Sequence, residues 1–179
     1  MNILDAQKDM RYGYLGGGVG MFVSGIVWLI SGIIAFNGET NQAIWALLIG
    51  GALISPISGI ITKILGRPDK ATHGNLLLNL ALESTVWLIF GSLIAYGISQ
   101  INSQWFYPAM LLTIGGRYLT FSTIYGIRAY WVCGALLAMA GFALAVFNVP
   151  FPFQAFAGAL IEIVFSPFIF LIGRKEVKL

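Results

Sequence analysis

Six windows of about 20 apolar residues follow one another along the chain, and they restrict its fold more than any other feature. A window of this length suits the hydrocarbon core of a bilayer, which is about 30 Å thick. The separators between the windows are short. The sequence therefore predicts an all-α integral membrane bundle of six transmembrane helices, at residues 14–36, 43–65, 76–98, 105–126, 130–147 and 153–172.

The composition excludes a water-soluble domain. Of the 179 residues, 58% are hydrophobic and 9% are charged, and the mean hydropathy is +0.85. A soluble domain carries about 25% charged residues, which it needs to cover its surface. The single cysteine, Cys133, lies in an apolar run, so the chain has no internal disulfide and no thiolate metal cluster.

The basic residues orient the predicted spans. Nine of them flank the spans on one side, whereas the separators "NGETNQ", "QINSQ" and "NVPFP" carry no Lys or Arg. Short loops with excess positive charge stay in the cytoplasm, so both termini are predicted to be cytoplasmic. The predicted division is a cytoplasmic N-terminal segment at residues 1–13, a membrane domain at 14–172 and a cytoplasmic basic tail at 173–179. The nine are Lys8, Arg11, Lys63, Arg67, Lys70, Arg128, Arg174, Lys175 and Lys178.

These bases also indicate the partners. Each would contribute about 1 kcal/mol of attraction to anionic lipid headgroups, so membrane lipids are the expected partners. Nucleic acid is not expected, because no basic surface with stacking aromatic residues lies outside the spans. Residues 1–13 favour a short interfacial helix capped by Asn2, with Ile3, Ala6 and Met10 on one face.

Two apolar motifs recur and suggest an internal repeat. "VWLISG" (27–32) returns as "VWLIFG" (86–91), and "LLIGGALIS" (47–55) resembles "LLTIGGRYLT" (111–120). Three two-helix repeats are one hypothesis, as in transporters built from repeated units. Chance similarity between apolar segments is the alternative.

Small residues predict close helix packing. Gly16, Gly20 and Ser24 recur every fourth residue, which lets another helix approach. A phosphate loop is not expected at "LGGGVG" (15–20), because the flanking residues of such a loop are missing. The remaining glycines predicted to pack, within the chain or in a homo-oligomer, are Gly51, Gly116 and Gly158.

Three charged side chains lie well inside the spans: Glu83, Arg117 and Glu162. At 1.5 Å per residue they lie about 10 to 15 Å in from the cytoplasmic ends of their helices. Spans three and four should be antiparallel neighbours, which predicts a Glu83–Arg117 pair with Glu162 as competitor or second partner. A lone charge at this depth costs several kcal/mol, whereas a hydrogen-bonded pair is tolerated.

Polar neighbours extend this predicted cluster with Asn79 on the third span and Thr113 and Thr120 on the fourth. One interpretation is an ion-pair lock that only fixes helix packing. The other is a site for a solute or ion, because one arginine cannot neutralise two carboxylates and one acid remains to take up a proton or a cation.

Signatures of enzymes and metal sites are missing. The chain has no HExxH, GxSxG or CxxC, and its one histidine, His73, lies in a loop without neighbouring ligands. No metal and no cofactor are therefore expected. The two glutamates beside Arg117 could act as an acid and a base, so an intramembrane enzyme remains an alternative.

Three segments carry a resemblance to a known family. "LGRP" (65–68), "LALESTVWLIFG" (80–91) and "YPAMLLTIGGRYLTFSTIYGIR" (107–128) resemble a domain-of-unknown-function family of small bacterial multi-pass membrane proteins. The resemblance runs over most of the chain. It implies a bacterial cytoplasmic (inner) membrane protein and transfers no functional residues.

Two functions remain from the sequence. The first is a protein that binds or transports a small solute or ion through the Glu/Arg/Glu cluster. The second is a membrane scaffold or partner subunit in which the cluster only holds helices together.

Overall fold

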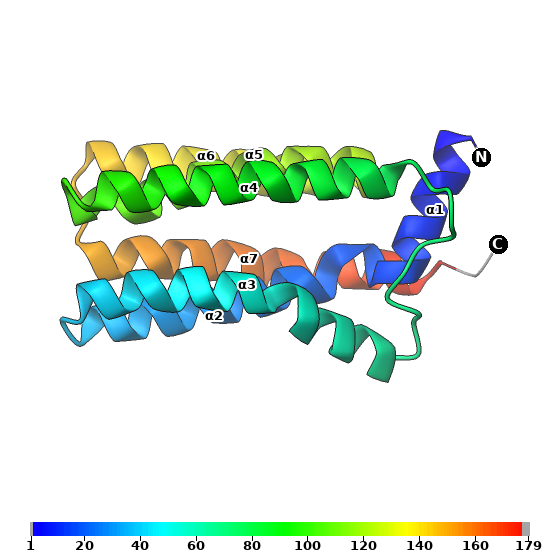
Figure 1. Ribbon diagram of the computed structural model, residues 1–179, viewed down its shortest axis with the longest axis horizontal. Coiled ribbons are helices and arrows are strands. Elements are labelled where there is room, and N and C mark those ends of the chain that lie inside the picture. The colour runs from blue at the N-terminus through cyan, green and yellow to red at the C-terminus, as the bar shows by residue number, and fades with distance from the viewer. Residues whose placement is uncertain (1, 177–179) are drawn as a thin grey trace.

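The computed structural model describes residues 2–176, and within them the chain is helical with no strand (Figure 1). The prediction of an all-α fold is confirmed. Six long helices follow a short N-terminal one. In chain order the elements are α1 (Ile3–Tyr14), the 3-10 turn η1 (Leu15–Gly17), α2 (Gly18–Phe36), α3 (Thr40–Ile64), α4 (Leu77–Ser99), the 3-10 turn η2 (Ser103–Trp105), α5 (Phe106–Tyr125), α6 (Ala129–Val146) and α7 (Phe151–Arg174).

The N-terminal segment forms the helix that its sequence predicted. The side chain of Asn2 caps α1 by accepting a hydrogen bond of 2.9 Å from the backbone N–H of Asp5. The helix ends where Leu15 adopts a φ of 52° and two glycines follow with φ of 65° and 83°. Left-handed backbone suits glycine, so Gly16 and Gly17 turn the chain, and α2 starts at Gly18 rather than at residue 14.

The six long helices form two layers, with α2, α3 and α7 in one and α4, α5 and α6 in the other (Figure 1). In the first layer α2 packs between α3 and α7, and in the second α5 packs between α4 and α6. Contact between the layers runs mainly through α7, which meets α6 and α5. The helices thus follow one another around the bundle in chain order, and contact between α3 and α4 is slight.

The hairpins α2–α3, α4–α5 and α6–α7 correspond to the three predicted units. Two of the three junctions between hairpins, α7 with α2 and α5 with α6, are extensive, but the junction of α3 with α4 is not. There the rings of Trp45 and Tyr96 meet with centroids 5.3 Å apart. The internal repeat stays a prediction.

Helix α3 leaves the bundle over its last turns (Figure 1). Pro56 lies inside it and has no N–H to donate to the preceding turn, so a helix bends at such a residue. Beyond Pro56, only Gly59 and Thr62 of α3 are buried. The following loop, residues 65–76, runs back across the end of the bundle to α4.

Eight of the nine bases that flank the predicted spans lie at one end of the bundle, and the ninth, Lys178, lies outside the described residues. This end, called the basic end below, holds α1, the loop 65–76, the turn between α5 and α6, and the end of α7 (Figure 1). The opposite end holds the three other connections, residues 37–39, 100–102 and 147–150, which contain no Lys or Arg. The uneven charge predicted from the sequence therefore corresponds to two ends of one bundle.

The outer surface is strongly apolar. Large side chains on several helices are more than half exposed, among them Ile60 at 60%, Trp87 at 71% and Phe142 at 67%. Five helical stretches are long and apolar enough to cross a membrane: Ile3–Phe36, Thr40–Ile64, Leu77–Ser99, Ala129–Val146 and Phe151–Arg174. The predicted fourth span, α5, is not among them, because Arg117 and several hydroxyl side chains lower its hydropathy.

Candidate functional site

Glu162 lies in the interior of the bundle. Its side chain is 0% exposed. Gly158 and Ser166, one turn away on either side, are buried on the same face of α7, as expected for residues four apart in a helix. The inward face of α7 therefore presents one carboxylate among small residues.

Only one oxygen of this carboxylate has a well-formed hydrogen bond. Tyr118, on α5, donates a hydrogen bond of 2.7 Å from its hydroxyl to Oε1 of Glu162. The hydroxyl of Ser24, on α2, lies close enough to interact with the same carboxylate, but its geometry is not that of a well-formed hydrogen bond. The other oxygen, Oε2, is buried and has no hydrogen-bond partner among residues 2–176. Three helices thus meet at an acid that is half satisfied.

Aromatic rings lie between Glu162 and the basic end. The ring of Tyr118 packs on Phe121 and Tyr130, with centroids 5.7 and 5.6 Å apart, and Tyr125 stacks on Tyr130 at 5.7 Å. Tyr130 also donates a hydrogen bond of 2.8 Å to the carbonyl of Gly16. These four rings connect α5 and α6 to the turn before α2, and one of them, Tyr118, contacts the acid.

Arg117 forms no hydrogen bond and no ion pair with Glu162 in the described residues. Its Nη2 donates a hydrogen bond of 3.1 Å to Oγ1 of Thr85 on α4, and its guanidinium lies 4.9 Å from the centroid of the Phe121 ring. Its Nε is buried and has no hydrogen-bond partner among residues 2–176. Successive helical residues point about 100° apart, which is why Arg117 and Tyr118 reach different neighbouring helices.

The predicted Glu83–Arg117 pair is wrong for the part of the chain that the structure describes. Glu83 is exposed and forms no ion pair there. It shares a face with Asn79 and Trp87, as predicted, but all three are exposed. The next residue, Ser84, is the buried one. The inward face of α4 is therefore rotated by one residue from the predicted face.

The two predicted threonines lie on α5 near Arg117 without touching Glu162 in any described hydrogen bond. Thr113 is half-buried and donates a hydrogen bond of 2.8 Å to the carbonyl of Ala109 in its own helix. Its side chain fills the space beside Gly91 of α4. Thr120 is half-buried as well. Within the predicted polar cluster, Glu162 and Arg117 thus have different hydrogen-bond partners, and Glu83 is exposed.

Two of the predicted packing glycines lie at close contacts. A Cβ on Gly158 would come 2.9 Å from the ring of Trp28 and 3.1 Å from Leu111. One on Gly16 would come 3.3 Å from the carbonyl of Ile169. Since ordinary van der Waals contact begins at about 3.5 Å, α7 can approach α2, α5 and η1 only with glycine at these positions.

The other predicted glycines, Gly20, Gly51 and Gly116, do not lie at such close contacts. Gly20 is half-buried, and its nearest neighbour across the helix contact is the hydroxyl of Ser58, 3.8 Å from an added Cβ. Gly51 and Gly116 are exposed, with nothing within 4 Å of an added Cβ. These two glycines therefore pack against no helix within residues 2–176, and their packing between subunits stays a prediction.

A second polar region lies at the basic end and ties the termini together. Arg11 donates from Nε to Oε1 of Glu176 and from Nη1 to the carbonyl of Tyr125, both at 2.6 Å. Arg67 donates from Nη2 to the carbonyls of Arg174 and Glu176 at 2.8 and 2.9 Å. The Arg11–Glu176 pair is the one ion pair found within residues 2–176.

The loop 65–76 is held to α1 by an aspartate. Asp9 accepts hydrogen bonds of 2.8 Å from the backbone N–H of Thr72, 2.7 Å from the Thr72 hydroxyl and 2.8 Å from Nδ2 of Asn75. Asp69, in the same loop, has a left-handed φ of 52°. Burial raises the pKa of Asp69 above its ordinary value, and nearby Lys63 partly opposes this rise.

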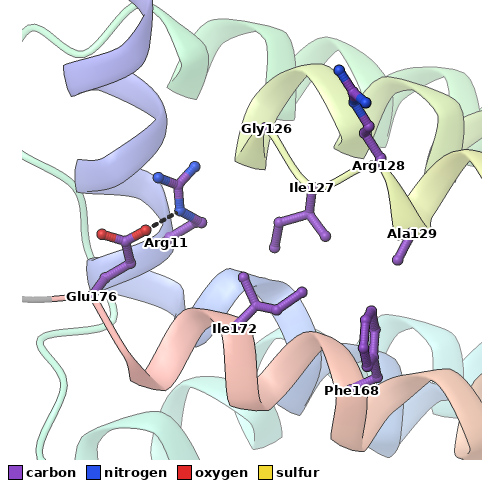
Figure 2. Close-up of a pocket in the computed structure, with 8 residues that line it drawn as sticks. All are labelled: Arg11, Gly126, Ile127, Arg128, Ala129, Phe168, Ile172 and Glu176. Carbon is purple, nitrogen blue, oxygen red and sulfur yellow. Dashed lines mark hydrogen bonds and ion pairs between the residues drawn. The ribbon is translucent and has the colours of Figure 1, made fainter.

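A cavity of about 430 Å³ opens at the basic end. Figure 2 shows it between Arg11 and Glu176 on one side and the turn around Ile127 on the other, with Ile172 and Phe168 of α7 along its length. A second cavity of about 570 Å³ shares Gly126 and Arg128 with the first and is also lined by Trp131. None of the three predicted intramembrane charges lines either cavity.

Sequence reasoning missed four residues of these two regions. Tyr118 and Thr85 had a usable signal, because a buried hydroxyl in an apolar span must find a hydrogen-bond partner. In the sequence Arg11 is only one of nine bases, and no local feature singles out Glu176. Their pairing depends on how the two chain ends fold against the bundle, 165 residues apart in sequence.

Comparison with protein families yields one match. Residues 3–172 match the Family of unknown function (DUF7010). No curated protein and no solved structure matches the chain.

Proposed function

The chain belongs to this family of unknown function, and from that premise we propose that it is a six-span membrane protein that transports a small solute or ion. Glu162 is the residue that exchanges a proton or a cation. The expected location is a bacterial inner membrane with both termini in the cytoplasm. One feature of the described geometry favours this function over a purely structural one. That feature is the hydrogen bonding of the Glu162 carboxylate.

That carboxylate is fully buried, and its Oε2 has no hydrogen-bond partner among residues 2–176. A buried ionised acid is costly unless it is paired and hydrogen-bonded. A lock that served only stability would satisfy both oxygens, whereas an acid that takes up and releases a proton or cation needs one of them free. Intramembrane acids of this kind mark proton relays and ion pathways in transporters.

The six-span topology has geometric support although α5 is less apolar than the others. Helix α4 ends at the end of the bundle opposite to the basic end, and α6 begins at the basic end (Figure 1). The 20 residues of α5 are about 30 Å long, which matches the hydrocarbon core. If α4 and α6 cross the membrane, α5 must cross it between them.

A scaffold or partner subunit is the second candidate, and Glu83 is the observation that favours it. This carboxylate is exposed on α4 between exposed Leu82 and Trp87. Lipid tails cannot solvate a carboxylate, but a polar group on another chain can. A second copy of the protein against α4 would provide such a group, in a homo-oligomer.

Flux in proteoliposomes tests the proposed transport. Purified protein is reconstituted in vesicles that contain a pH-sensitive dye, and a pH gradient is applied with and without candidate cations outside. We expect proton movement with wild-type protein and none with Glu162→Gln, which keeps the size of the side chain. Glu83→Gln is the matched control and should retain flux. Equal flux for wild type and Glu162→Gln would reject the role of Glu162.

Labelling of single cysteines tests the topology separately. Cys133 is buried in α6 and is first replaced by alanine. A cysteine is then placed at His73, in the loop at the basic end, or at Asn102, at the opposite end. In intact cells an impermeant maleimide should label the variant at position 102 and not the one at position 73. The reverse pattern would contradict the proposed orientation.

A further inference from the structure

We propose that the cavity at the turn between α5 and α6 binds the phosphate of an anionic phospholipid. This inference rests on the membrane location in the proposed function, but it does not involve Glu162. The first cavity is open to the surface, is lined by three elements, α1, the turn at residues 126–128 and the last turns of α7, and holds about 430 Å³ (Figure 2). That volume lies within the range of small-ligand sites and suits a headgroup rather than a whole lipid.

The polar side of the cavity carries excess positive charge. Arg11, Arg128 and Glu176 are its charged lining residues, so the net charge of this set is positive. Arg11 is fixed in place by hydrogen bonds of its Nε and Nη1. Its Nη2 donates no hydrogen bond to residues 2–176. Arginine is suited to phosphate because its planar group offers several donors in a fixed arrangement.

Of the two arginines, Arg128 forms fewer interactions with the described residues. It is exposed, it occupies the position directly before α6, and it lines both cavities. In Figure 2 its guanidinium points away from the first cavity, on the side of the turn opposite to Ile127, the residue before it, which points into that cavity. It forms no ion pair with residues 2–176. A phosphate at the turn would supply an anionic partner for a side chain that has none there.

The apolar side of the cavity continues toward the predicted lipid. Phe168 is 57% exposed and lies beside Ile172 along the cavity, with Ala129 facing them from α6 (Figure 2). The second cavity adds Trp131 and Val132, which are 57% and 54% exposed. Tryptophan is typical of the headgroup level, so a phosphate near Arg128 would leave its acyl chains along α6 and α7.

The occupant is a lipid because charge and apolar surface occur together. A free phosphate would use the arginines but leave the Phe168 side uncovered, and a zwitterionic lipid would gain less from the excess positive charge. The position at the basic end also fits, since anionic lipids enrich the cytoplasmic leaflet. Glu176 is the group with which the phosphate competes for Arg11.

Thermal stabilisation by added lipid tests this site. Purified protein in a neutral detergent is titrated with phosphatidylglycerol, phosphatidylcholine or inorganic phosphate, and the melting temperature is followed. We expect stabilisation that saturates with phosphatidylglycerol and little with the other two. Equal stabilisation by phosphatidylcholine would reject recognition of the anionic headgroup, and equal stabilisation by inorganic phosphate would reject the lipid as occupant.

Charge-neutral variants locate the site. Arg128→Gln should weaken the apparent affinity for phosphatidylglycerol by about fivefold, the effect of about 1 kcal/mol. Arg11→Gln should weaken it further if the variant folds. Arg174→Gln removes one charge from the same end but lies outside both cavities, and it should bind as wild type does. An equal loss in Arg128→Gln and Arg174→Gln would show attraction to the whole basic end and overturn the site.

Because this assay measures binding without flux, its outcome is independent of the transport experiment. Loss of lipid binding with normal flux in Arg128→Gln would separate the two proposals. Loss of flux with normal lipid binding in Glu162→Gln would separate them as well.

Discussion

The hydroxyl of Tyr118 donates a hydrogen bond of 2.7 Å to Oε1 of Glu162 and so joins α5 in one layer of the bundle to α7 in the other. Both side chains are buried, at 5% and 0% exposure. Direct contact between α5 and α7 is limited, which makes this bond an important link between the layers. It also leaves the acid with one free oxygen, and the proposed exchange depends on that oxygen.

Tyr118→Phe removes this link without changing the packing of the ring. We expect the variant to lose about 1 to 3 kcal/mol of stability, the range for a hydrogen bond to a charged or buried group whose partner is left unpaired. Thermal melting in detergent measures the change. Tyr96→Phe is the control, because Tyr96 contributes a ring contact to Trp45 at the opposite end. An equal effect of both variants would argue against a special role of the Tyr118 hydroxyl.

Arg117 should couple to Thr85 and not to Glu83. The guanidinium donates to the Thr85 hydroxyl, so a double-mutant cycle with Arg117→Leu and Thr85→Val should give a coupling of about 0.5 to 1.5 kcal/mol. A cycle with Arg117→Leu and Glu83→Gln should be additive within about 0.5 kcal/mol. Chemical or thermal unfolding of the four proteins in each cycle gives both numbers. Strong coupling of Arg117 to Glu83 would restore the pair that the sequence predicted.

Gly158→Ala should destabilise the bundle while Gly51→Ala should not. At position 158 the new methyl group would meet the Trp28 ring at 2.9 Å, and such overpacking costs about 1 to 3 kcal/mol. At position 51 nothing lies within 4 Å, and alanine is a better helix former than glycine. The melting temperatures of the two variants test the contrast. If Gly51→Ala prevents self-association in a cross-linking assay, its face contacts another chain.

The helix positions could be predicted from the sequence, but the helix faces could not. The six predicted windows agree with α2–α7 to within a few residues, because long apolar runs bounded by polar turns have few alternatives. α4 is apolar nearly all round, so its periodicity does not separate the face that meets neighbouring helices from the outer face. For this reason Glu83 was assigned to the interior, although the inward residue is Ser84.

The positions of the candidate site residues could be predicted only in part, and their role stays a prediction. Glu162 lies in the interior, but its partner is Tyr118 rather than Arg117, and a tyrosine gives no charge signal in an apolar span. The link between Arg11 and Glu176 joins the two ends of the chain, and nothing local in either segment indicates it. Such contacts are set by the order in which helices pack around the bundle.

Asp69→Asn should stabilise the protein, and the gain should grow with pH. Burial raises the pKa of Asp69 above its unfolded value, so the neutral acid is favoured in the folded state. That contribution is present below the unfolded pKa, about 4, and is lost as the pH rises through the folded pKa. Asparagine stays neutral and tolerates the left-handed φ of this position. The melting temperature of Asp69→Asn should exceed that of wild type by more above the folded pKa than below the unfolded pKa. A gain that shrinks with rising pH would contradict the expectation.

The most direct test of the central claim is an infrared pH titration of the protein in lipid, compared with Glu162→Gln. The carbonyl stretch of a protonated carboxyl group is separate from the bands of carboxylates, so it reports the state of a buried acid. We predict a carboxyl band that disappears as the pH rises or as a bound cation replaces the proton, and that is missing from Glu162→Gln. A Glu162 band that stays unchanged at every pH at which the protein remains folded, or that is absent throughout, would contradict exchange at this residue.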